Sequence, residues 1–226
     1  MKSIEQKRVR VELHLHTRRS KDSLVSIEDL LKRCDQVGID KVAITDHNQI
    51  ENARKTKAMF PDRVIVGEEI ETTRGELIGY FMTELVPPGL EPMAAIDRLR
   101  AQGALISVAH PFDTTRTQHW AEDELEAIAT YVDAIETFNA RCLSNKPNQA
   151  AEDFAKKHGL QETVGSDAHS LWEVGRAYLT MPGFADAAGF AAGLPKAEKT
   201  TRLSSPLVHL FSRYAVLNKK LRKIFS

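Results

Sequence analysis

The segment 9–17, VRVELHLHT, alternates between apolar and polar residues. A period of two is typical of a β-strand with two unlike faces. The polar face carries His14 and His16 near the end of the strand, whereas the other face carries the aliphatic residues Val9, Val11, Leu13 and Leu15. We expect the aliphatic face to pack under helices, which leaves both imidazoles facing a polar interior. Two side chains two residues apart on a strand can share one cation there.

Strand-like and helix-like segments alternate along the rest of the chain. Short apolar runs predict strands at 41–45, 63–66, 77–82, 104–109, 132–136 and 162–165. Helical patterns occupy 26–37, 49–59, 91–102, 121–130 and 148–158. The first helix opens with a capping box at Ser26 and Asp29 and ends at Gly38. This alternation predicts an α/β fold with a parallel sheet.

Charge and composition exclude several classes of protein. The chain has 226 residues, with 31 basic and 31 acidic side chains, so no overall charge attracts nucleic acid or a membrane. No apolar stretch has the length of a membrane span, and no apolar run follows the basic start, so we expect a cytoplasmic protein. Cys34 and Cys142 are far apart and are expected to be free thiols.

Nearly every predicted strand ends in a histidine or an acidic residue. The collected strand-end and loop residues are His14, His16, Asp22, Asp46, His47, Glu68, Glu69, His110, Glu136, Asn139, Asp167 and His169. In a closed barrel the carboxyl ends of all strands meet at one mouth, so this distribution favours a barrel over an open sheet. Imidazole and carboxylate without thiolate suit divalent zinc, manganese or iron. The set exceeds what one tetrahedral ion uses, so a site with several ions is predicted, of the kind that hydrolases use on phosphate esters.

Five motifs in this order resemble those of the PHP (polymerase and histidinol phosphatase) family of metal-dependent phosphoesterases. They are HLHT, AITDHN, GEEIET, AHP and GSDAHS, and the resemblance spans about residues 9–181. It implies a distorted (β/α)7 TIM-like barrel with two or three divalent ions at its mouth.

The resemblance also implies a set of metal ligands. His14, His16, Glu69 and Asp167 would hold one ion, and Glu69 would bridge to a second ion held by His110. A third ion would be held by Asp22, His47 and His169. No histidine occupies the remaining position on the second ion, for which Glu76, Glu136 and Asn139 are the candidates. Glu69 is preferred to Glu68 because alternation turns only one of two neighbours toward the mouth. Asp46 is expected to be a structural loop residue, and the alternative is an acceptor that hydrogen-bonds to a metal ligand.

Further residues are predicted to act on the substrate. Arg116, Arg141 and Arg176 follow strand ends and can clamp a phosphate. A cluster residue among Asp22, His47 and His169 is expected to serve catalysis, including proton delivery to the leaving alkoxide.

The composition changes after Pro182, and residues 195–199 resemble a linker. We therefore predict a barrel at 1–195 and, at 196–226, a linker with a basic amphipathic helix from Pro206 to Phe225. This helix is expected to dock on the barrel or on another subunit, and a membrane surface or a phosphate-rich partner is the alternative. His209 within it is expected to lie away from catalysis.

The function predicted from these residues is hydrolysis of a small phosphate ester or nucleotide, including a 3′,5′-bisphosphate or a nucleic-acid end, by metal-activated water. Two alternatives are an amidohydrolase-like enzyme, which also begins with His-x-His, and a non-catalytic metal-stabilised module tethered to nucleic acid or membrane by its basic tail.

Overall fold

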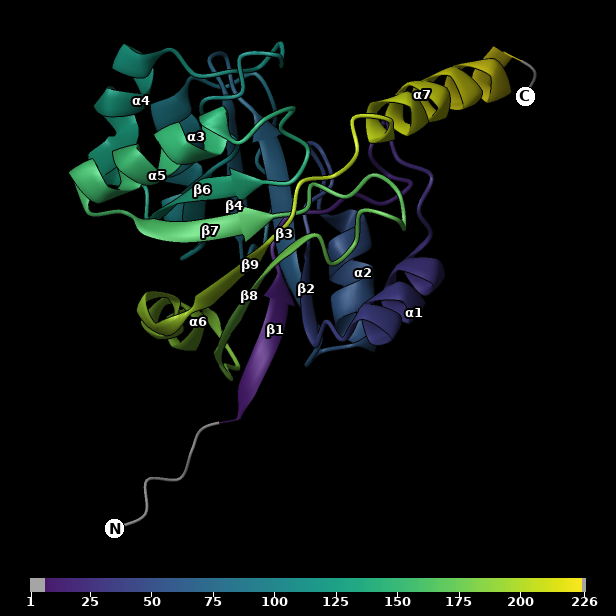
Figure 1. Ribbon diagram of the computed structural model, residues 1–226, viewed down its shortest axis with the longest axis horizontal. Helices are drawn as coiled ribbons and strands as arrows, with labels where there is room; N and C mark the ends of the chain where they lie inside the picture. The colour runs from purple at the N-terminus through teal and green to yellow at the C-terminus, as the bar shows by residue number, and fades with distance from the viewer. Residues whose placement is uncertain (1–6, 225–226) are drawn as a thin grey trace.

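The computed structural model describes residues 7–224 (Figure 1). The strands are β1 (Arg8–Glu12), β2 (Lys41–Ile44), β3 (Val64–Glu71), β4 (Glu76–Tyr80), β5 (Leu105–Val108), β6 (Ala134–Asn139), β7 (Gln161–Gly165), β8 (Ala177–Pro182) and β9 (Glu198–Thr201). The helices are α1 (Ile27–Val37), α2 (Glu51–Met59), α3 (Pro92–Ala101), α4 (Glu122–Ile128), α5 (Lys146–His158), α6 (Ala187–Gly193) and α7 (Val208–Ile224). The elements up to β7 and the last helix lie close to the predicted ranges, whereas β8, α6 and β9 were not predicted. Phe225, the predicted end of the last helix, lies outside the described residues.

Helix α1 shows how local sequence sets these bounds. The Ser26 hydroxyl accepts a hydrogen bond from the Asp29 backbone N–H at 3.1 Å and so caps the first turn. Gly38 ends the helix with φ of 75°, a left-handed conformation that glycine adopts without a steric penalty. Both predicted signals are confirmed.

The strands form one sheet in the order β7-β6-β5-β4-β3-β2-β1-β8-β9. Strands β1, β2 and β3 are parallel, as are β5, β6 and β7, but β4 is antiparallel to both of its neighbours. The prediction of a parallel sheet is therefore wrong at β4, and also at β8, which is antiparallel to both β1 and β9. Only residues 72–75 separate β3 from β4, and such a short connection cannot carry the crossover that parallel strands need.

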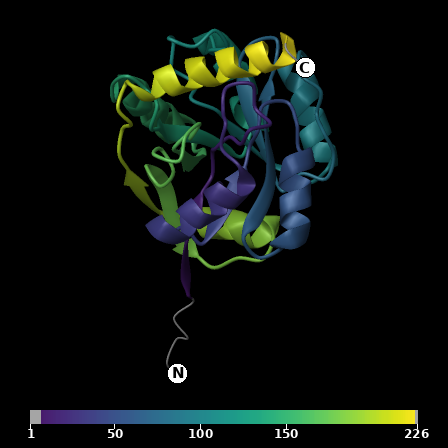
Figure 2. The ribbon, with the colours of Figure 1, turned by 90° about the vertical axis from the view of Figure 1, so that its right-hand side faces the viewer.

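The sheet nearly closes into a barrel, which confirms the predicted fold class. Beyond β7, the Asp167 N–H donates to the His14 carbonyl at 2.8 Å, and the His16 N–H donates to the Ala168 carbonyl at 2.9 Å. These bonds bring the chain after β7 beside the chain after β1. Figure 2 shows α7 lying across one end of the barrel, with α6 at the opposite end.

The expected packing of β1 needs a correction. Val11 and Leu13 belong to the interior apolar cluster with Ile78 and Val164, whereas Leu15 packs in the outer cluster with α1. Alternation breaks because regular pairing stops at Glu12: the Leu15 N–H donates to the Thr45 side-chain hydroxyl at 3.0 Å instead of to a neighbouring strand. The two histidines nevertheless face the mouth, as described below.

The expected linker at 195–199 is also wrong in part, because β9 pairs with β8 from Ala177 to Thr180. The docking of the last helix on the barrel is confirmed, since Lys219 Nζ donates to the backbone carbonyl of Arg18 at 2.8 Å. Both cysteines are free, as predicted, and the structure shows that both are buried. Within residues 7–224, no helix is long and apolar enough to cross a membrane.

Candidate metal centre and active site

Four predicted ligands meet at the mouth of the barrel. His14 Nε2 lies 3.2 Å from one oxygen of Glu69, and His16 Nε2 lies 3.3 Å from the other. Asp167 Oδ1 lies 3.1 Å from His16 Nε2 and 3.6 Å from His14 Nε2. All four side chains are buried. The carboxylate of Glu69 thus stands between two imidazoles.

A second group shares Glu69. His110 Nε2 lies 2.9 Å from Glu69 Oε1 and 3.4 Å from Glu76 Oε2. Ligand atoms of these three residues lie within 4.8 Å of one another, which suits a common cation. Of the three candidates for the remaining position, Glu76 is therefore the one that the fold brings to His110.

The other two candidates, Glu136 and Asn139, form hydrogen bonds to residues of the cluster. Glu136 accepts from His14 Nδ1 at 2.9 Å and from the His110 N–H at 2.9 Å. Asn139 Nδ2 donates to Glu136 at 3.0 Å and to Asp167 at 3.3 Å. A carboxylate on the far nitrogen of an imidazole fixes its tautomer and orients the near nitrogen. Glu136 and Asn139 therefore position the predicted ligands.

A third group lies toward the cavity. Asp22 Oδ2 lies 3.1 Å from His169 Nε2 and 3.7 Å from His47 Nε2. Ligand nitrogens of His16, His47 and His169 also lie within 4.8 Å of one another. Lys21 Nζ lies 2.8 Å from Glu71, and Glu71 joins His47 and Glu76 in a further group.

Glu71 was not singled out from the sequence. The signal for it is simple, because Glu69 and Glu71 are two residues apart on β3 and so share a face. Glu68 points to the other face, where it accepts from the Val86 N–H at 3.1 Å. The preference for Glu69 over Glu68 thus agrees with the geometry.

Asp46 lies beneath this site. Its carboxylate accepts from the Thr17 N–H and hydroxyl at 2.7 and 2.6 Å, and from the Ser20 hydroxyl at 2.7 Å. Ser20 Oγ in turn lies 3.1 Å from His16 Nδ1. Both carboxylate oxygens of Asp46 are occupied, so Asp46 holds the first loop and orients His16 indirectly.

The cluster leaves buried polar atoms without hydrogen-bond partners. They are His14 Nε2, His16 Nε2, Asp22 Oδ1, His47 Nδ1, Glu69 Oε2, His110 Nδ1 and Asp167 Oδ1. Unpaired buried polar atoms are costly and rare in folded proteins. Most of these atoms converge on the same space and have the chemistry of zinc, manganese or iron ligands. The residues present therefore fit a group of divalent ions.

Burial and neighbouring charges shift the pKa values of the cluster residues. Burial opposes charge on His14, but the Glu69 and Glu136 carboxylates raise its pKa well above the usual value. Burial, reinforced by the neighbouring imidazoles of His169 and His47, lowers the pKa of His16 to about 3. Burial and the Glu69 carboxylate raise the pKa of Glu76 to about 7. Without cations, the carboxylates of this cluster are balanced by protons on part of its imidazoles.

Two predicted ligands have unusual backbone conformations. His110 has φ of 26° and Asp167 has φ of 53°, in the left-handed region that most side chains avoid. Such residues cost on the order of 1–3 kcal/mol each and persist where the surroundings fix them. Here the local bonds from His110 N–H to Glu136 and from Asp167 N–H to His14 hold both turns.

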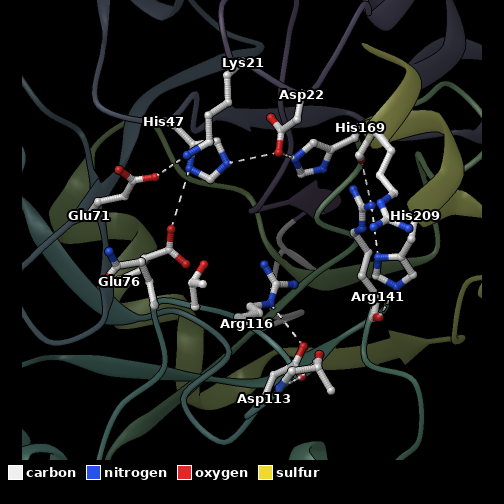
Figure 3. Close-up of a pocket in the computed structure, with 15 residues that line it drawn as sticks. Lys21, Asp22, His47, Glu71, Glu76, Asp113, Arg116, Arg141, His169 and His209 are labelled. Atoms are coloured by element: carbon white, nitrogen blue, oxygen red, sulfur yellow. Dashed lines mark hydrogen bonds and ion pairs between the residues drawn. The ribbon is translucent and has the colours of Figure 1, made fainter. Parts of the chain in front are cut away.

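A cavity of about 440 Å³ opens beside the cluster. In Figure 3, Asp22, His47 and His169 lie on one side of it and Arg116 on the opposite side. Arg116 Nη2 contacts Asp167 Oδ2 at 2.5 Å, and burial, which opposes its charge, is outweighed by Asp167, so the pKa of Arg116 is raised well above its usual value. Its guanidinium is therefore a permanent positive charge beside the cluster.

The other two predicted phosphate-binding arginines differ in their position relative to the cavity. Arg141 is buried and lines the cavity. Arg176 is half-buried and is not among the lining residues; its N–H donates to the Glu173 carbonyl at 3.0 Å, and its carbonyl accepts from the Arg202 N–H at 2.8 Å. Arg176 lies where the chain enters β8, which adds to the sheet beside β1, so its role at the phosphate stays a prediction without a place in the cavity wall.

The position of His209 differs from the expectation that this residue lies away from the site. It lines the cavity together with Ser212 and Arg213 of α7, and its Nε2 lies 3.2 Å from the Arg141 carbonyl. Helical spacing alone shows which residues share a face of α7 but not which face meets the barrel. The contribution of α7 to the cavity could not be found from the sequence.

Comparison with known proteins identifies the family of this chain. The family model described as PHP domain matches residues 12–166. The chain belongs to the PHP family. A PHP-associated model also matches residues 145–197. This PHP protein is 43% identical over 175 residues to the uncharacterized protein MJ0417 of Methanocaldococcus jannaschii, covering 76% of this chain and 70% of the relative.

Solved structures share the fold of this PHP protein. PsfC from Pseudomonas syringae PB-5123 superposes with a TM-score of 0.69 at 20% identity, over 92% of this chain and 98% of PsfC. A two-domain protein from Bacteroides vulgatus, which contains a predicted PHP-like metal-dependent phosphoesterase, gives 0.66 at 16% identity, over 87% of this chain and 66% of that protein. The family match and the cluster together support a metal-dependent hydrolase.

Proposed function

We propose that this PHP protein hydrolyses a small phosphate ester or nucleotide, with the cluster holding two or three divalent ions. The observation that carries the proposal is the pairing of a buried cluster of imidazoles and carboxylates with Arg116 across one cavity. Such ions lower the pKa of a bound water and neutralise phosphoryl oxygens, which is the chemistry that phosphate-ester hydrolysis needs.

The chain distributes the ligands in three groups under this proposal. His14, His16, Glu69 and Asp167 form the first; Glu69, Glu76 and His110 form the second; Asp22, His47 and His169 form the third. Glu69 is common to the first two groups, since its Oε1 lies 3.2 Å from His14 Nε2 and 2.9 Å from His110 Nε2, while its Oε2 lies 3.3 Å from His16 Nε2. The buried unpaired atoms of these residues support the assignment.

Arg116 acts on the reacting phosphate. Its side chain lines the cavity and is fixed by Asp113, which lies 3.1 Å from Nε, and by Asp167. A guanidinium held in this way stabilises charge that develops on the equatorial oxygens of a transferring phosphoryl group. When the cluster holds only two ions, Asp22 and His169, which line the cavity 3.1 Å apart, are free of metal, and this pair holds one proton that it passes to the leaving oxygen.

The test is hydrolysis of a panel of phosphomonoesters, 3′,5′-bisphosphonucleotides and phosphodiesters, followed by phosphate release for the first two and by release of the alcohol for the diesters. Metal-stripped protein refilled with manganese, zinc or iron is compared with His14→Ala and Asp167→Ala, and with His158→Ala as the matched control. His158 contacts Glu126 at 3.1 Å and is not a lining residue. We expect metal-dependent turnover that both cluster variants reduce by at least about 100-fold and that the control retains.

A carboxyl ester and an amide are tested beside this panel, with release of the carboxylate as the readout. Turnover of these alone would replace the phosphoesterase proposal with the amidohydrolase alternative. Absence of phosphate-ester hydrolysis by protein carrying its full complement of metal would reject the proposal.

A further inference from the structure

Helix α7 docks on the barrel by a row of small and polar side chains. Positions 208, 212, 215 and 219 are three or four residues apart, so their side chains lie along one face of the helix. Val208 and Ala215 are buried there. Lys219 Nζ donates to the Arg18 carbonyl at 2.8 Å. Val208 is the largest apolar side chain in this docked row, so the row buries little apolar surface.

The opposite face of α7 carries large apolar side chains that remain exposed. An exposed row lies two positions from the docked row, which is slightly more than half a helical turn, and therefore points away from the barrel. Its members Leu210, Tyr214, Leu217 and Leu221 are 57, 59, 56 and 46% exposed. A surface helix normally turns its apolar row toward the core. Here the large apolar row faces solvent, and Figure 1 shows α7 extending outward from the end of the barrel.

Neighbouring side chains widen the exposed row into a patch. Phe211 is 50% exposed, and Trp172, on the loop between β7 and β8, is 75% exposed. These two residues line a groove of about 280 Å³ together with Tyr214 and Leu24. We refer to the exposed row with Leu24, Phe211 and Trp172 as the outer patch. Scattered exposed apolar residues are common, but a contiguous patch of this kind marks a binding surface.

The charged side chains of α7 are all basic. Arg213 and Lys220 are exposed and two turns apart, so they lie together along one side of the exposed row. Arg222 is exposed along the other side. The sequence contains no acidic residue in 199–226. Beside Trp172, helix α1 adds two basic residues and one acidic residue, Lys32, Arg33 and Asp29. The outer patch is therefore bordered by an excess of positive charge.

A second copy of the chain does not complement this surface. In a two-fold dimer formed through α7, the same face meets itself, so the basic residues of one copy would oppose those of the other. A stable protein interface also uses about 20–30 residues from each partner, which is far more than the outer patch provides. Both arguments favour an occupant that is negatively charged and that imposes no matching shape.

A bilayer surface with anionic lipids has these properties. An amphipathic helix with leucine and aromatic residues on one face and basic residues beside them lies in the headgroup region. Tryptophan and tyrosine rings favour the same region, and long basic side chains reach the lipid phosphates from the edges of an apolar face. We propose that the outer patch binds the surface of a membrane that contains anionic lipids, with α7 lying along this surface. The proposal does not depend on the reaction that the metal cluster catalyses.

The first test is flotation of the metal-loaded full chain with lipid vesicles. One set contains phosphatidylcholine alone, and the other contains equal parts of phosphatidylcholine and phosphatidylglycerol. We expect wild type to bind the mixed vesicles, and Leu217→Ser to weaken this binding about 10-fold through lost apolar burial. Lys220→Glu should weaken it about 30-fold, since each of the two charges changed contributes about 5-fold.

The controls make the same substitutions outside the outer patch. Leu85→Ser replaces a leucine that is 48% exposed and lines a separate groove beside α3. Lys156→Glu reverses an exposed charge near the end of α5. We expect both controls to bind the mixed vesicles as wild type does. High salt should weaken the binding of wild type, because it screens the attraction between basic side chains and anionic lipids.

The second test uses the fluorescence of Trp172. We expect the emission of wild type to move to shorter wavelength on addition of mixed vesicles, because the exposed ring of Trp172 leaves water. Trp120, the other tryptophan, is 5% exposed and should contribute little to this change. The Trp172→Phe variant should lose the shift and still float with the mixed vesicles.

Several outcomes would overturn the proposal. They are binding of wild type to neither kind of vesicle, equal binding to both kinds, and unchanged binding of Leu217→Ser. Sedimentation velocity on the same samples tests the alternative occupant. A wild-type dimer that dissociates in Leu217→Ser and does not bind vesicles would assign the outer patch to a second copy of the chain.

Discussion

Glu68 is a buried acid whose ionisation can be followed through stability. It lies next to Glu69 on β3 but faces the opposite side of the sheet, with no exposed surface and with the Val86 N–H as its hydrogen-bond donor at 3.1 Å. Burial raises its pKa from 4.5 to about 8. No residue of the metal cluster contributes to this shift, so replacing Glu68 probes the core and not the metals.

The sign and the size of the pH dependence of stability follow from proton linkage at Glu68. Between pH 4.5 and about 8 the folded protein keeps a proton on Glu68 that the unfolded chain releases. The contribution of Glu68 is therefore most favourable below pH 4.5, and stability falls as the pH rises toward 8. The slope approaches about 1.4 kcal/mol per pH unit, which accumulates to about 3 kcal/mol at pH 7. Glu68→Gln removes this dependence.

The assay is urea unfolding of wild type and Glu68→Gln at pH 5.5, 6.5 and 7.5, with the metals removed by a chelator. We expect the stability of the variant relative to wild type to increase by about 1–1.4 kcal/mol for each pH unit. Any constant cost of the new amide cancels in this difference. The exposed Glu84→Gln is the control and should give no such trend. A difference that does not vary with pH would refute the reasoning.

Two further predictions concern packing around the site. A Cβ at Gly165 would lie 2.2 Å from Glu136 Oε1 and 2.4 Å from His14 Cβ, so Gly165→Ala should lower stability by about 1–3 kcal/mol in urea and reduce the bound metal measured by mass spectrometry; unchanged values of both would contradict this packing. Cys34 is 1% exposed, and burial raises the pKa of its thiol to about 12, so it should react with a disulfide reagent at pH 8 only after unfolding. Reaction of the folded protein within seconds would show that the Cys34 thiol is accessible in the folded state.

Much of the barrel could be predicted because its strands are short apolar runs that end in polar residues. The helix start at Ser26 and the end at Gly38 followed from side-chain capping and from the conformational freedom of glycine. The direction of β4 was not predicted, since it depends on how a four-residue loop turns, and an apolar pattern carries no direction.

The candidate site also contains residues that could be predicted from the sequence and residues that could not. His14, His16 and Glu69 were predicted from local order within a strand or motif, and their side chains do meet. The positions of Arg176 and His209 could not be predicted, because they depend on how later parts of the chain pack against the mouth. A residue near a motif can point elsewhere, and a residue far from every motif can return to the site on a docked helix.

The central claim is that Glu69 joins two metal sites on which phosphate-ester hydrolysis depends. The most direct measurement is metal content per chain, taken together with phosphate release on the same samples of wild type, Glu69→Gln and the neighbouring control Glu68→Gln. The account predicts two or three ions per chain and turnover in wild type and in Glu68→Gln. It predicts fewer ions and a loss of turnover of at least about 100-fold in Glu69→Gln. Equal metal content and equal turnover in the two variants, or wild type that binds no metal, would contradict it.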